Sequence, residues 1–463
     1  MSSSIATVTG LRGPRVLAAV VIAIGLVIAV GASLGSPLIT AVATEYGVSL
    51  AAAQWTLTIA LLAGAVATPV LGRLGSGPRR RGVVLVMLGI VLLGSVLTVL
   101  PLPFGFLLAG RAAQGAGLGL SALMMATARD HLDEQHAGRT IATLSIASTV
   151  GVGVGYPLSG FLADLAGIRA AYGLGLGITA IALVAAVVVL PPAPPRTASR
   201  FDVPGVLLLT VALVPLLVVI SQTTLWRRNT ALAIAILVFS LIIFTAWAVV
   251  ETRTAQPLVD VRLLRHPAIA VANLVMLTGG VGMYLLLSLI TRYVQTPAAA
   301  GYGFGLNTFQ AGLVLVPFSI LGFVAGRLMP RLRSRFGARS LLAASTAVVL
   351  TAFVVFALAR GQLGGPVVAM SILGIGVGSF SASMPAVILA ATPPAETASA
   401  MGVNQVVRSV GFSIGSALGG LILAAHTTAV FPSQGGYGAA AWTGAATTAA
   451  TLLIVAVFYP KRP

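Results

Sequence analysis

The chain has 463 residues, of which 58% are hydrophobic and only 8% are charged, and its mean hydropathy is +1.04. A soluble domain carries roughly 25% charged residues, so this composition excludes a water-soluble fold. The net charge of +18 would suggest a nucleic-acid partner for a soluble protein. Here the basic residues lie in short segments between apolar runs, where they orient helices and meet anionic lipid, so we expect no nucleic-acid binding. Cysteine is absent, which excludes disulfides, thiolate metal sites and thiol catalysis.

Long apolar stretches recur along the whole chain. A bilayer core of about 30 Å requires about 20 apolar residues in a helix, and this length predicts fourteen transmembrane helices. In chain order they fall at residues 15–42, 50–72, 83–101, 103–127, 140–163, 170–191, 203–221, 229–249, 268–290, 308–329, 338–359, 365–391, 399–424 and 437–459. The pattern therefore predicts an all-α membrane protein.

Arginine and lysine fall mainly in every second connection between these spans. With the amino terminus in the cytoplasm, most of the 27 basic residues lie in cytoplasmic segments. The positive-inside rule then predicts a multi-pass protein with both termini in the cytoplasm. Nearly exclusive use of Arg over Lys, with abundant Ala, Gly and Val, indicates a bacterial source and hence the bacterial cytoplasmic membrane.

Two basic loops at comparable positions indicate an internal repeat. After the second span residues 72–81 read GRLGSGPRRR, and after the tenth span residues 326–339 read GRLMPRLRSRFGAR. A Pro-rich connection, PPAPPRTASRFDV, follows the sixth span. A six-span repeat with two extra spans between its copies explains this spacing. We expect an N-terminal six-helix bundle at 1–190, a linker with two accessory transmembrane helices at 191–265, and a C-terminal six-helix bundle at 266–463.

Further motifs follow in a fixed order. Residues 111–117 (RAAQGAG) are similar to the pattern R-x-x-Q-G-x-G, and residues 151–160 (GVGVGYPLSG) to G-x-x-x-G-P-x-x-G-G. Residues 251–260 (ETRTAQPLVD) are similar to E-x-R-x-x-x-P-L-x-D, and residues 404–415 read NQVVRSVGFSIG. With the two loops, which are similar to G-x-L-x-D-R-x-G-R-[KR], these motifs cover nearly the whole chain. The chain resembles the major facilitator superfamily, and within it the fourteen-helix drug/proton antiporter branch.

This resemblance implies a secondary transporter that exports small amphiphilic compounds, as in multidrug or metabolite efflux, by alternating access between two bundles. The expected partners are a small-molecule substrate, membrane lipid and, if transport is coupled, protons; no cofactor is expected, and the transporter is expected to be a monomer. Because the sequence has no P-loop and no motif that joins a nucleophile to a base, we expect no enzyme. The alternative is a flippase or uniporter of the same fold for lipids or lipid-linked precursors. A non-transporting receptor is less favoured, since no ligand or signalling domain is attached.

The sequence also departs from the family's patterns. Ser76 stands where the loop pattern has Asp, Tyr156 where the later motif has Pro, and Ser159 where it has Gly. The first span has no acidic residue, although the branch carries an Asp there that is linked to proton coupling. An antiporter needs a group that exchanges its proton for substrate, usually a carboxylate in a dry site. The sequence therefore leaves proton coupling open.

Polar side chains inside the spans are the candidate substrate-binding residues. A guanidinium at membrane depth costs about 3 kcal/mol on insertion scales and faces a bundle interior or a cavity. For Arg111 this favours a role in substrate binding over the alternative role of a purely structural hydrogen-bond hub. Gln114 lies on the same helix face, and Asn404 with Arg408 forms a second polar stripe that could equally join helices. Arg292 and Trp55 lie near span ends, where interfacial anchoring is the alternative role. This set favours a neutral or anionic amphiphile over a dication.

Small residues and the basic loops have a mechanical interpretation. Glycines one helical turn apart allow close helix packing, with or without sliding of the two halves. The predicted packing residues are Gly151, Gly155, Pro157, Gly160, Gly411 and Gly415. The predicted gating residues are Gly72, Arg79, Arg80, Arg81, Gly326, Arg327, Gly337 and Arg339, with Asp130, Asp133 or Glu134 as ionic partners. The four histidines show no metal-ligand spacing, so no metal site is expected.

Overall fold

The computed structural model describes residues 13–34, 38–48, 50–194, 202–221, 223–255, 257–259, 261–427 and 431–458. Regular structure in these ranges is helical, apart from one isolated bridge between Thr427 and Pro432. The chain divides into two units. The first comprises Met1–Val206, Thr254–Asp260 and Thr392–Gln405, and the second comprises Leu207–Arg253, Val261–Ala391 and Val406–Pro463. Both chain ends lie outside the described residues, so the predicted position of the termini is not described.

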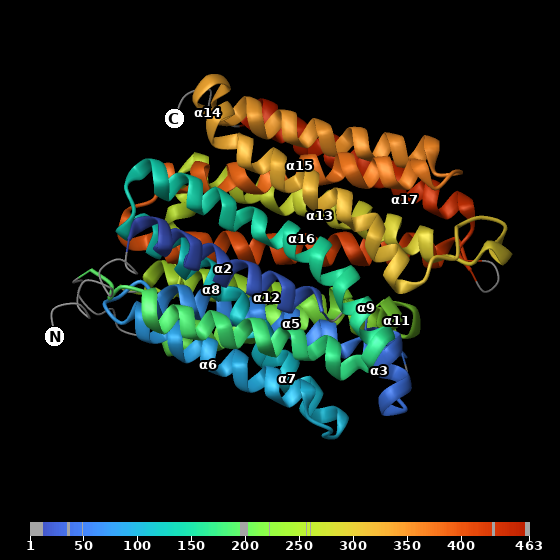
Figure 1. Cartoon of the computed structure of the whole chain (residues 1–463). Helices are drawn as coiled ribbons and strands as arrows, with labels where there is room; N and C mark the ends of the chain where they lie inside the picture. The colour runs from blue at the N-terminus through green and yellow to red at the C-terminus, as the bar shows by residue number, and fades with distance from the viewer. Residues whose placement is uncertain are drawn as a thin grey trace. The chain divides into compact units, whose positions relative to one another are not determined.

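The first unit contains most of the helices from the first half of the sequence (Figure 1). They are α2 (Pro14–Ser33), α3 (Ile39–Tyr46), α4 (Leu50–Ala53), α5 (Trp55–Leu74), α6 (Arg80–Val99), α7 (Phe104–Ala116), the 3-10 turn η1 (Gly117–Gly119), α8 (Leu120–His131) and α9 (Glu134–Val189). Helix α10 (Val203–Ser221) begins in this unit and continues in the second. Within the unit, α2 packs on α9, and α7 packs on both α5 and α6.

The second unit holds the remaining elements. They are α11 (Thr223–Arg228), α12 (Thr230–Arg253), η2 (Val261–Arg265), α13 (Pro267–Gln295), η3 (Ala298–Ala300), α14 (Thr308–Ala359), α15 (Gly364–Ala390) and α17 (Gln434–Phe458). The short turn η4 (Pro394–Glu396) and the first residues of α16 (Thr397–Ala425) belong to the first unit, whereas the rest of α16 belongs to the second. Helix α14 packs on α15 and α17, and α13 packs on α15 and α17.

Local sequence explains where the two longest helices begin and bend. The Asp133 side chain accepts a hydrogen bond from the backbone N–H of His136 and so caps α9. Asn307 and Gln310 form a reciprocal capping box at the start of α14. Gly167 inside α9 and Gly337 inside α14 have φ of 78° and 75°, which a residue with a Cβ adopts only with strain. Each long helix therefore consists of two segments joined at a glycine.

Eleven helices among the described residues are long and apolar enough to cross a membrane. This number is lower than the fourteen spans that the sequence predicts, and it does not establish the predicted count. The difference has a physical source. Helices α9 and α14, with 56 and 52 residues, are each counted once although each bends, and α7 and α8 are each too short to be counted. What the fold establishes is an all-helical, multi-pass membrane architecture.

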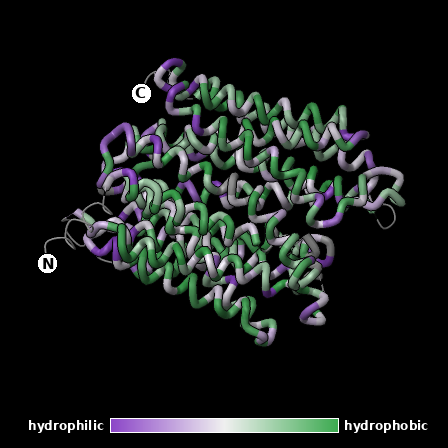
Figure 2. The backbone as a smooth tube through the Cα atoms, viewed as in Figure 1, coloured by the Kyte–Doolittle hydropathy of each residue, from purple (hydrophilic) through white to green (hydrophobic). Residues whose placement is uncertain are grey.

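Apolar side chains face outward as well as inward, as expected where lipid is the solvent. Figure 2 shows long green segments along the helices of both units. Ile181 is 72% exposed, Leu93 is 67% exposed and Leu358 is 74% exposed. In water such residues would be buried, whereas acyl chains solvate them. The informative side chains are therefore the polar ones buried within each unit.

Candidate functional site

Arg111 lies in the middle of α7 and is fully buried in the first unit. Its Nε donates to the carbonyl oxygen of Thr56 at 3.2 Å, and its Nη1 donates to the carbonyl oxygen of Gly31 at 3.0 Å. The same Nη1 donates to Oε1 of Gln114 at 2.7 Å. One guanidinium thus joins α7 to α2 and α5. The structure places Arg111 and Gln114 on one helix face and in direct contact, as their spacing predicts.

Gln114 extends this network to α6. Its Nε2 donates to Oγ of Ser95 at 3.0 Å and to Oγ1 of Thr98 at 3.4 Å. The two hydroxyls in turn donate to the carbonyl oxygens of Val91 and Ser95 of their own helix. The amide is therefore fixed in orientation, with its oxygen directed at the cation and its nitrogen at α6. Sequence analysis did not single out Ser95 and Thr98, although their spacing of three residues places them on one face of α6.

The charge of Arg111 has no carboxylate partner among the described residues. Its Nη2 is buried and makes no hydrogen bond within the described part of the chain. The guanidinium lies 5.9 Å from the ring centroid of Tyr172, a fully buried residue of α9 whose hydroxyl also makes no hydrogen bond there. Burial of a cation is costly unless it is paired. Among the described residues, the Arg111 cation meets only neutral acceptors and one aromatic ring. Its Nη2 group is therefore available to donate to an anion.

A second polar cluster lies where the basic loop after α5 meets α8. Arg80 Nη1 contacts Oδ2 of Asp130 at 2.6 Å, with exposures of only 3% and 4% for the two side chains. Arg80 Nε also donates to the carbonyl oxygen of Gly75 at 2.7 Å, and Arg81 donates to that of Val187 at the end of α9. Of the three acids expected as ionic partners of this loop, Asp130 is the one that the structure places against Arg80. Arg79, in contrast, is exposed.

The same loop contacts the start of α16, which belongs to this unit. Arg73 is buried and lies 3.9 Å from Glu396, the outer limit of an ion pair. Arg129 donates to the carbonyl oxygen of Thr392 at 3.1 Å and to Oγ1 of Thr397 at 2.8 Å. Burial lowers the pKa of Arg129, while the adjacent Asp130 carboxylate opposes that shift. These contacts join segments more than 260 residues apart in sequence, which explains why sequence reasoning missed Glu396 and Thr397 as partners.

Gly72 permits this close approach, whereas Gly402 has room for a Cβ. A Cβ on Gly72 would lie 3.0 Å from the carbonyl oxygen of Ala398, and one on Gly402 would lie 3.5 Å from that of Thr68. Gly72 was predicted as a gating residue, and the structure places it against α16. Any side chain there would press on the α16 backbone.

The other predicted binding residues lie on α5, α13 and α16. Trp55 is the first residue of α5, next to the Thr56 carbonyl that accepts from Arg111. Asn404 is buried in the part of α16 that belongs to the first unit. Arg408 lies in the second unit, 5.7 Å from the ring centroid of Phe412. Arg292 is exposed in the last turn of α13, as the interfacial-anchor alternative expects.

The predicted packing glycines lie at close helix contacts inside each unit. A Cβ on Gly151 would overlap Ala29 of α2, and one on Gly155 would overlap Oγ of Ser33. Pro157 and Gly160 are buried on the same helix, α9. In the second unit, Cβ atoms on Gly411 and Gly415 would meet carbonyl oxygens of α13, those of Leu277 and Val281. Each set thus fits α9 to α2 or α16 to α13.

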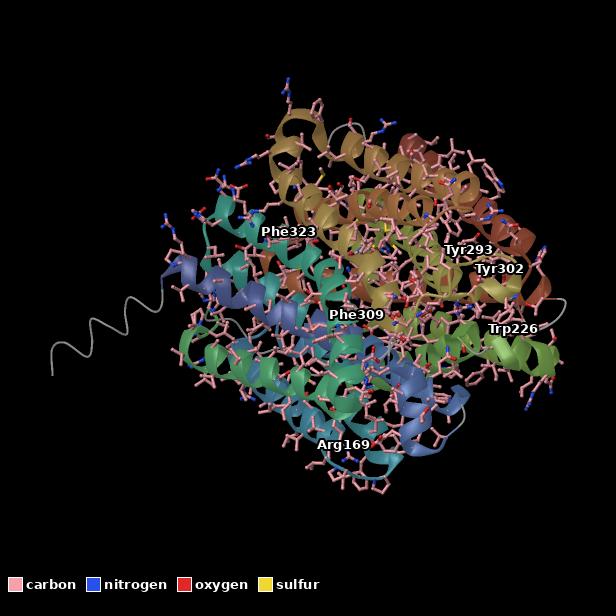
Figure 3. The ribbon with its side chains drawn as sticks, turned by 45° about the vertical axis from the view of Figure 1, so that its right-hand side comes forward. Arg169, Trp226, Tyr293, Tyr302, Phe309 and Phe323 are labelled. Carbon is pink, nitrogen blue, oxygen red and sulfur yellow. The ribbon has the colours of Figure 1, made fainter. Side chains whose placement is uncertain are left out.

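An aromatic cluster in the second unit was not anticipated. The rings of Tyr293 and Tyr302 lie 5.6 Å apart between centroids (Figure 3), and both are within 5.6 Å of Tyr437. Tyr437 and Thr296 exchange a hydrogen bond at 3.3 Å, and the Tyr302 hydroxyl donates to the carbonyl oxygen of Pro432. Burial raises the pKa of Tyr302. These contacts hold the loop after α13 against the loop before α17, so packing accounts for the cluster.

The second basic loop, residues 326–339, makes no ion pair with a described carboxylate. Gly337 forms the bend of α14, and Gly326 is buried while the next residue, Arg327, is exposed. Arg339 donates to the carbonyl oxygen of Ala456 on α17. Among the described residues, no group of three His, Asp or Glu side chains is placed to hold a metal ion.

The chain is similar to transporters along most of its length. A family model described as Major Facilitator Superfamily matches residues 20–416 and 285–463. The cephamycin export protein CmcT of Amycolatopsis lactamdurans is 29% identical over 386 residues, which cover 81% of this chain and 78% of the relative. The quinolone resistance protein NorB of Staphylococcus aureus is 25% identical, with 85% of each chain covered. The crystal structure of the human organic anion transporter MFSD10 (TETRAN) superposes with a TM-score of 0.68 over 96% of this chain and 99% of its own, at 16% identity, and so shares the fold.

Proposed function

Because the chain belongs to the Major Facilitator Superfamily, we propose that it is a secondary transporter that exports small amphiphilic compounds across a bacterial cytoplasmic membrane. The similarity to an antibiotic export protein and to a resistance protein over more than three quarters of each supports this direction of transport. The lipid-flippase alternative has no comparable support. No catalytic step is assigned to the chain.

We propose fourteen membrane passes, in two six-helix bundles with α10 and α12 as accessory helices. A helix of 56 residues would extend about 84 Å at 1.5 Å per residue, far more than a bilayer core of about 30 Å. The bends at Gly167 and Gly337 divide α9 and α14 into two passes each. Helices α7 and α8, joined by η1, supply the remaining pass. The basic loops would then face the cytoplasm, together with both termini.

The assignment of a substrate site rests on the buried guanidinium of Arg111. Its Nη2 is buried and makes no hydrogen bond among the described residues, and no described carboxylate neutralises it. An anionic or strongly polar group of a substrate would gain a charge-assisted hydrogen bond there, a type of bond roughly twice as strong as a neutral one. Gln114 would hold the guanidinium in place through its contacts with α6. A neutral or anionic amphiphile therefore fits this site better than a cation.

The loop after α5 is proposed as the cytoplasmic gate. Arg73 and Arg129 reach the segment that begins α16, and Gly72 allows that segment to come close. Arg129 donates two charge-assisted hydrogen bonds to this segment, each contributing about 1.5–3 kcal/mol, and the long ion pair of Arg73 contributes at most about 1 kcal/mol. Alternating access requires a closure that is strong enough to seal and weak enough to break, and these contacts meet that requirement.

Transport in proteoliposomes tests this function. Purified protein would be reconstituted, and a panel of anionic, neutral and cationic amphiphilic drugs would be offered under an imposed proton gradient while internal pH and drug uptake are recorded. We expect flux of anionic or neutral compounds above that of protein-free vesicles. Substrate-dependent proton release would establish antiport. Absence of flux for every compound, from protein shown to be folded, would contradict the proposal.

A further inference from the structure

The bend of α14 carries a dense group of exposed arginines. Residues 327–339, which we call the basic turn, include Arg327, Arg331, Arg333, Arg335 and Arg339. The first four are exposed, and only Arg339 is half-buried, where it donates to a backbone carbonyl of α17. Figure 2 shows purple segments where α14 turns, beside the α14 label of Figure 1. Like charges this close repel one another unless counter-charge is supplied.

The second unit offers almost no counter-charge. From residue 261 to residue 463 the sequence has a single acidic residue, Glu396. Glu396 belongs to the first unit and faces Arg73. The one acid that the sequence places in the second unit, Glu251, is fully buried in the last turn of α12. Within its own unit, then, the basic turn faces no exposed carboxylate among the described residues.

The matching loop of the first unit uses its arginines differently. There Arg80 is buried against Asp130, and Arg81 donates to a carbonyl oxygen of α9. Two loops that look alike in sequence therefore have opposite environments, one with internal ion pairs and one with exposed cations. The general tendency of basic residues to face the cytoplasm accounts for the side of the membrane, but not for this difference.

Exposed aromatic and apolar side chains accompany the arginines. Phe336 is 54% exposed directly before Gly337, and Arg335 lies 5.6 Å from its ring centroid. Leu328 is 43% exposed, and Arg327 lies 5.9 Å from the ring of Phe323, which is labelled in Figure 3. Aromatic rings and arginine stems favour the level of lipid headgroups, where the apolar part enters the bilayer and the charge meets phosphate.

We propose that the basic turn is a docking surface for anionic phospholipid headgroups of the leaflet that it faces. Both arms of the turn continue directly into apolar helix, so the headgroup layer lies within reach of its side chains. The unneutralised charge supplies attraction to acidic lipid, and Phe336 supplies an apolar anchor. A soluble acidic protein would match the charge but would leave Phe336 and Leu328 without an apolar environment. The proposal concerns lipid binding and does not depend on which compound is transported.

Site-directed spin labelling can test this directly, because the chain has no cysteine. Ser334→Cys places one label in the exposed middle of the turn, and Gln135→Cys places a control label beside Asp133 and Glu134. Each protein would be reconstituted into vesicles of phosphatidylcholine alone, or of phosphatidylcholine with about one quarter phosphatidylglycerol, and probed with oxygen and a water-soluble nickel chelate. We expect the label at 334 to become several-fold less accessible to nickel in the anionic vesicles, with no change at 135.

Charge removal provides the matched control. Arg331→Gln, Arg333→Gln and Arg335→Gln together should abolish the lipid-dependent change at 334. Arg139→Gln, Arg253→Gln and Arg265→Gln remove the same charge from other exposed positions and should leave the change intact. High salt of about 1 M, where the Debye length is about 3 Å, should reduce it.

Equal nickel accessibility at 334 in both vesicles would overturn the proposal. So would a lipid-dependent change that survives loss of the three turn arginines. Spin-labelled phosphatidylglycerol provides a second readout on unlabelled protein: its preference over labelled phosphatidylcholine should fall in the turn variant and not in the control variant. Circular dichroism of all variants would establish that each is folded before comparison.

Discussion

The buried ion pair between Arg80 and Asp130 leads to a sharp prediction about stability. Its atoms are 2.6 Å apart, with side-chain exposures of 3% and 4%. At an effective dielectric constant of about 20, the attraction at this distance is about 6 kcal/mol, before the cost of desolvating both ions is subtracted. Asp130→Asn leaves the Arg80 cation buried without its counter-charge, and loss of one partner of such a pair costs about 3–5 kcal/mol. We expect a loss of free energy of unfolding in that range.

Unfolding by a denaturing detergent, followed by tryptophan fluorescence, measures this change. The double variant Arg80→Met with Asp130→Leu removes both charges and should recover at least half of the lost free energy, because no ion is left unpaired. Glu45→Gln breaks the exposed pair of Glu45 with Arg169, whose atoms are 3.3 Å apart at 47% and 49% exposure, and should cost at most about 1 kcal/mol. If Asp130→Asn costs no more than Glu45→Gln, the electrostatic reasoning is wrong.

Three further predictions concern packing, backbone and capping. Gly115→Ala should lower the thermal unfolding midpoint, because its Cβ would overlap a backbone oxygen of α5, whereas Gly89→Ala, with open space around it, should be neutral or slightly stabilising. Gly337→Ala should lower the free energy of unfolding by about 1 kcal/mol or more, because a Cβ is strained at the φ of 75° found there. The detergent unfolding assay used for the ion pair measures this loss, and an unchanged free energy of unfolding would contradict the argument. A backbone hydrogen bond lowers the pKa of Asp133 from its usual value of 3.8, so the cap stabilises the fold above that value and is lost as pH falls through the lower folded-state pKa. Asp133→Asn should keep the cap and flatten the decline of the unfolding midpoint between about pH 5 and pH 2.5; an unaltered decline would exclude this group as its source.

Much of the fold was predictable, because lipid imposes a simple requirement on sequence. Apolar length marks each pass, and the positions of α5, α6, α12, α13, α15 and α17 follow the predicted spans closely. The number of passes does not follow from the number of helices. At Gly167 and Gly337 the helix bends and continues, although the sequence predicts that one span ends there and another begins.

The candidate site was predictable only where its members are close in sequence. Arg111 and Gln114 lie three residues apart, so helical geometry alone places them together. In the sequence, Tyr172 is a single aromatic residue in an apolar span. Nothing in the sequence indicates that its ring lies against the Arg111 guanidinium. The contact of Arg73 with Glu396 joins residues from opposite halves of the sequence. Such partners are determined by tertiary packing, which a single sequence does not reveal.

Binding of a transported amphiphile to wild-type protein and to Arg111→Gln tests the central claim most directly. Equilibrium affinity would be measured on purified protein in detergent, with Arg169→Gln as an exposed control. A hydrogen bond from a charged donor contributes about 1.5–3 kcal/mol, and every 1.4 kcal/mol is a factor of ten in affinity. We expect Arg111→Gln to weaken binding of an anionic compound by about 10–100-fold and Arg169→Gln to leave it unchanged. Equal affinity of folded wild-type and Arg111→Gln proteins for every transported compound would contradict the assignment of Arg111 to the substrate site.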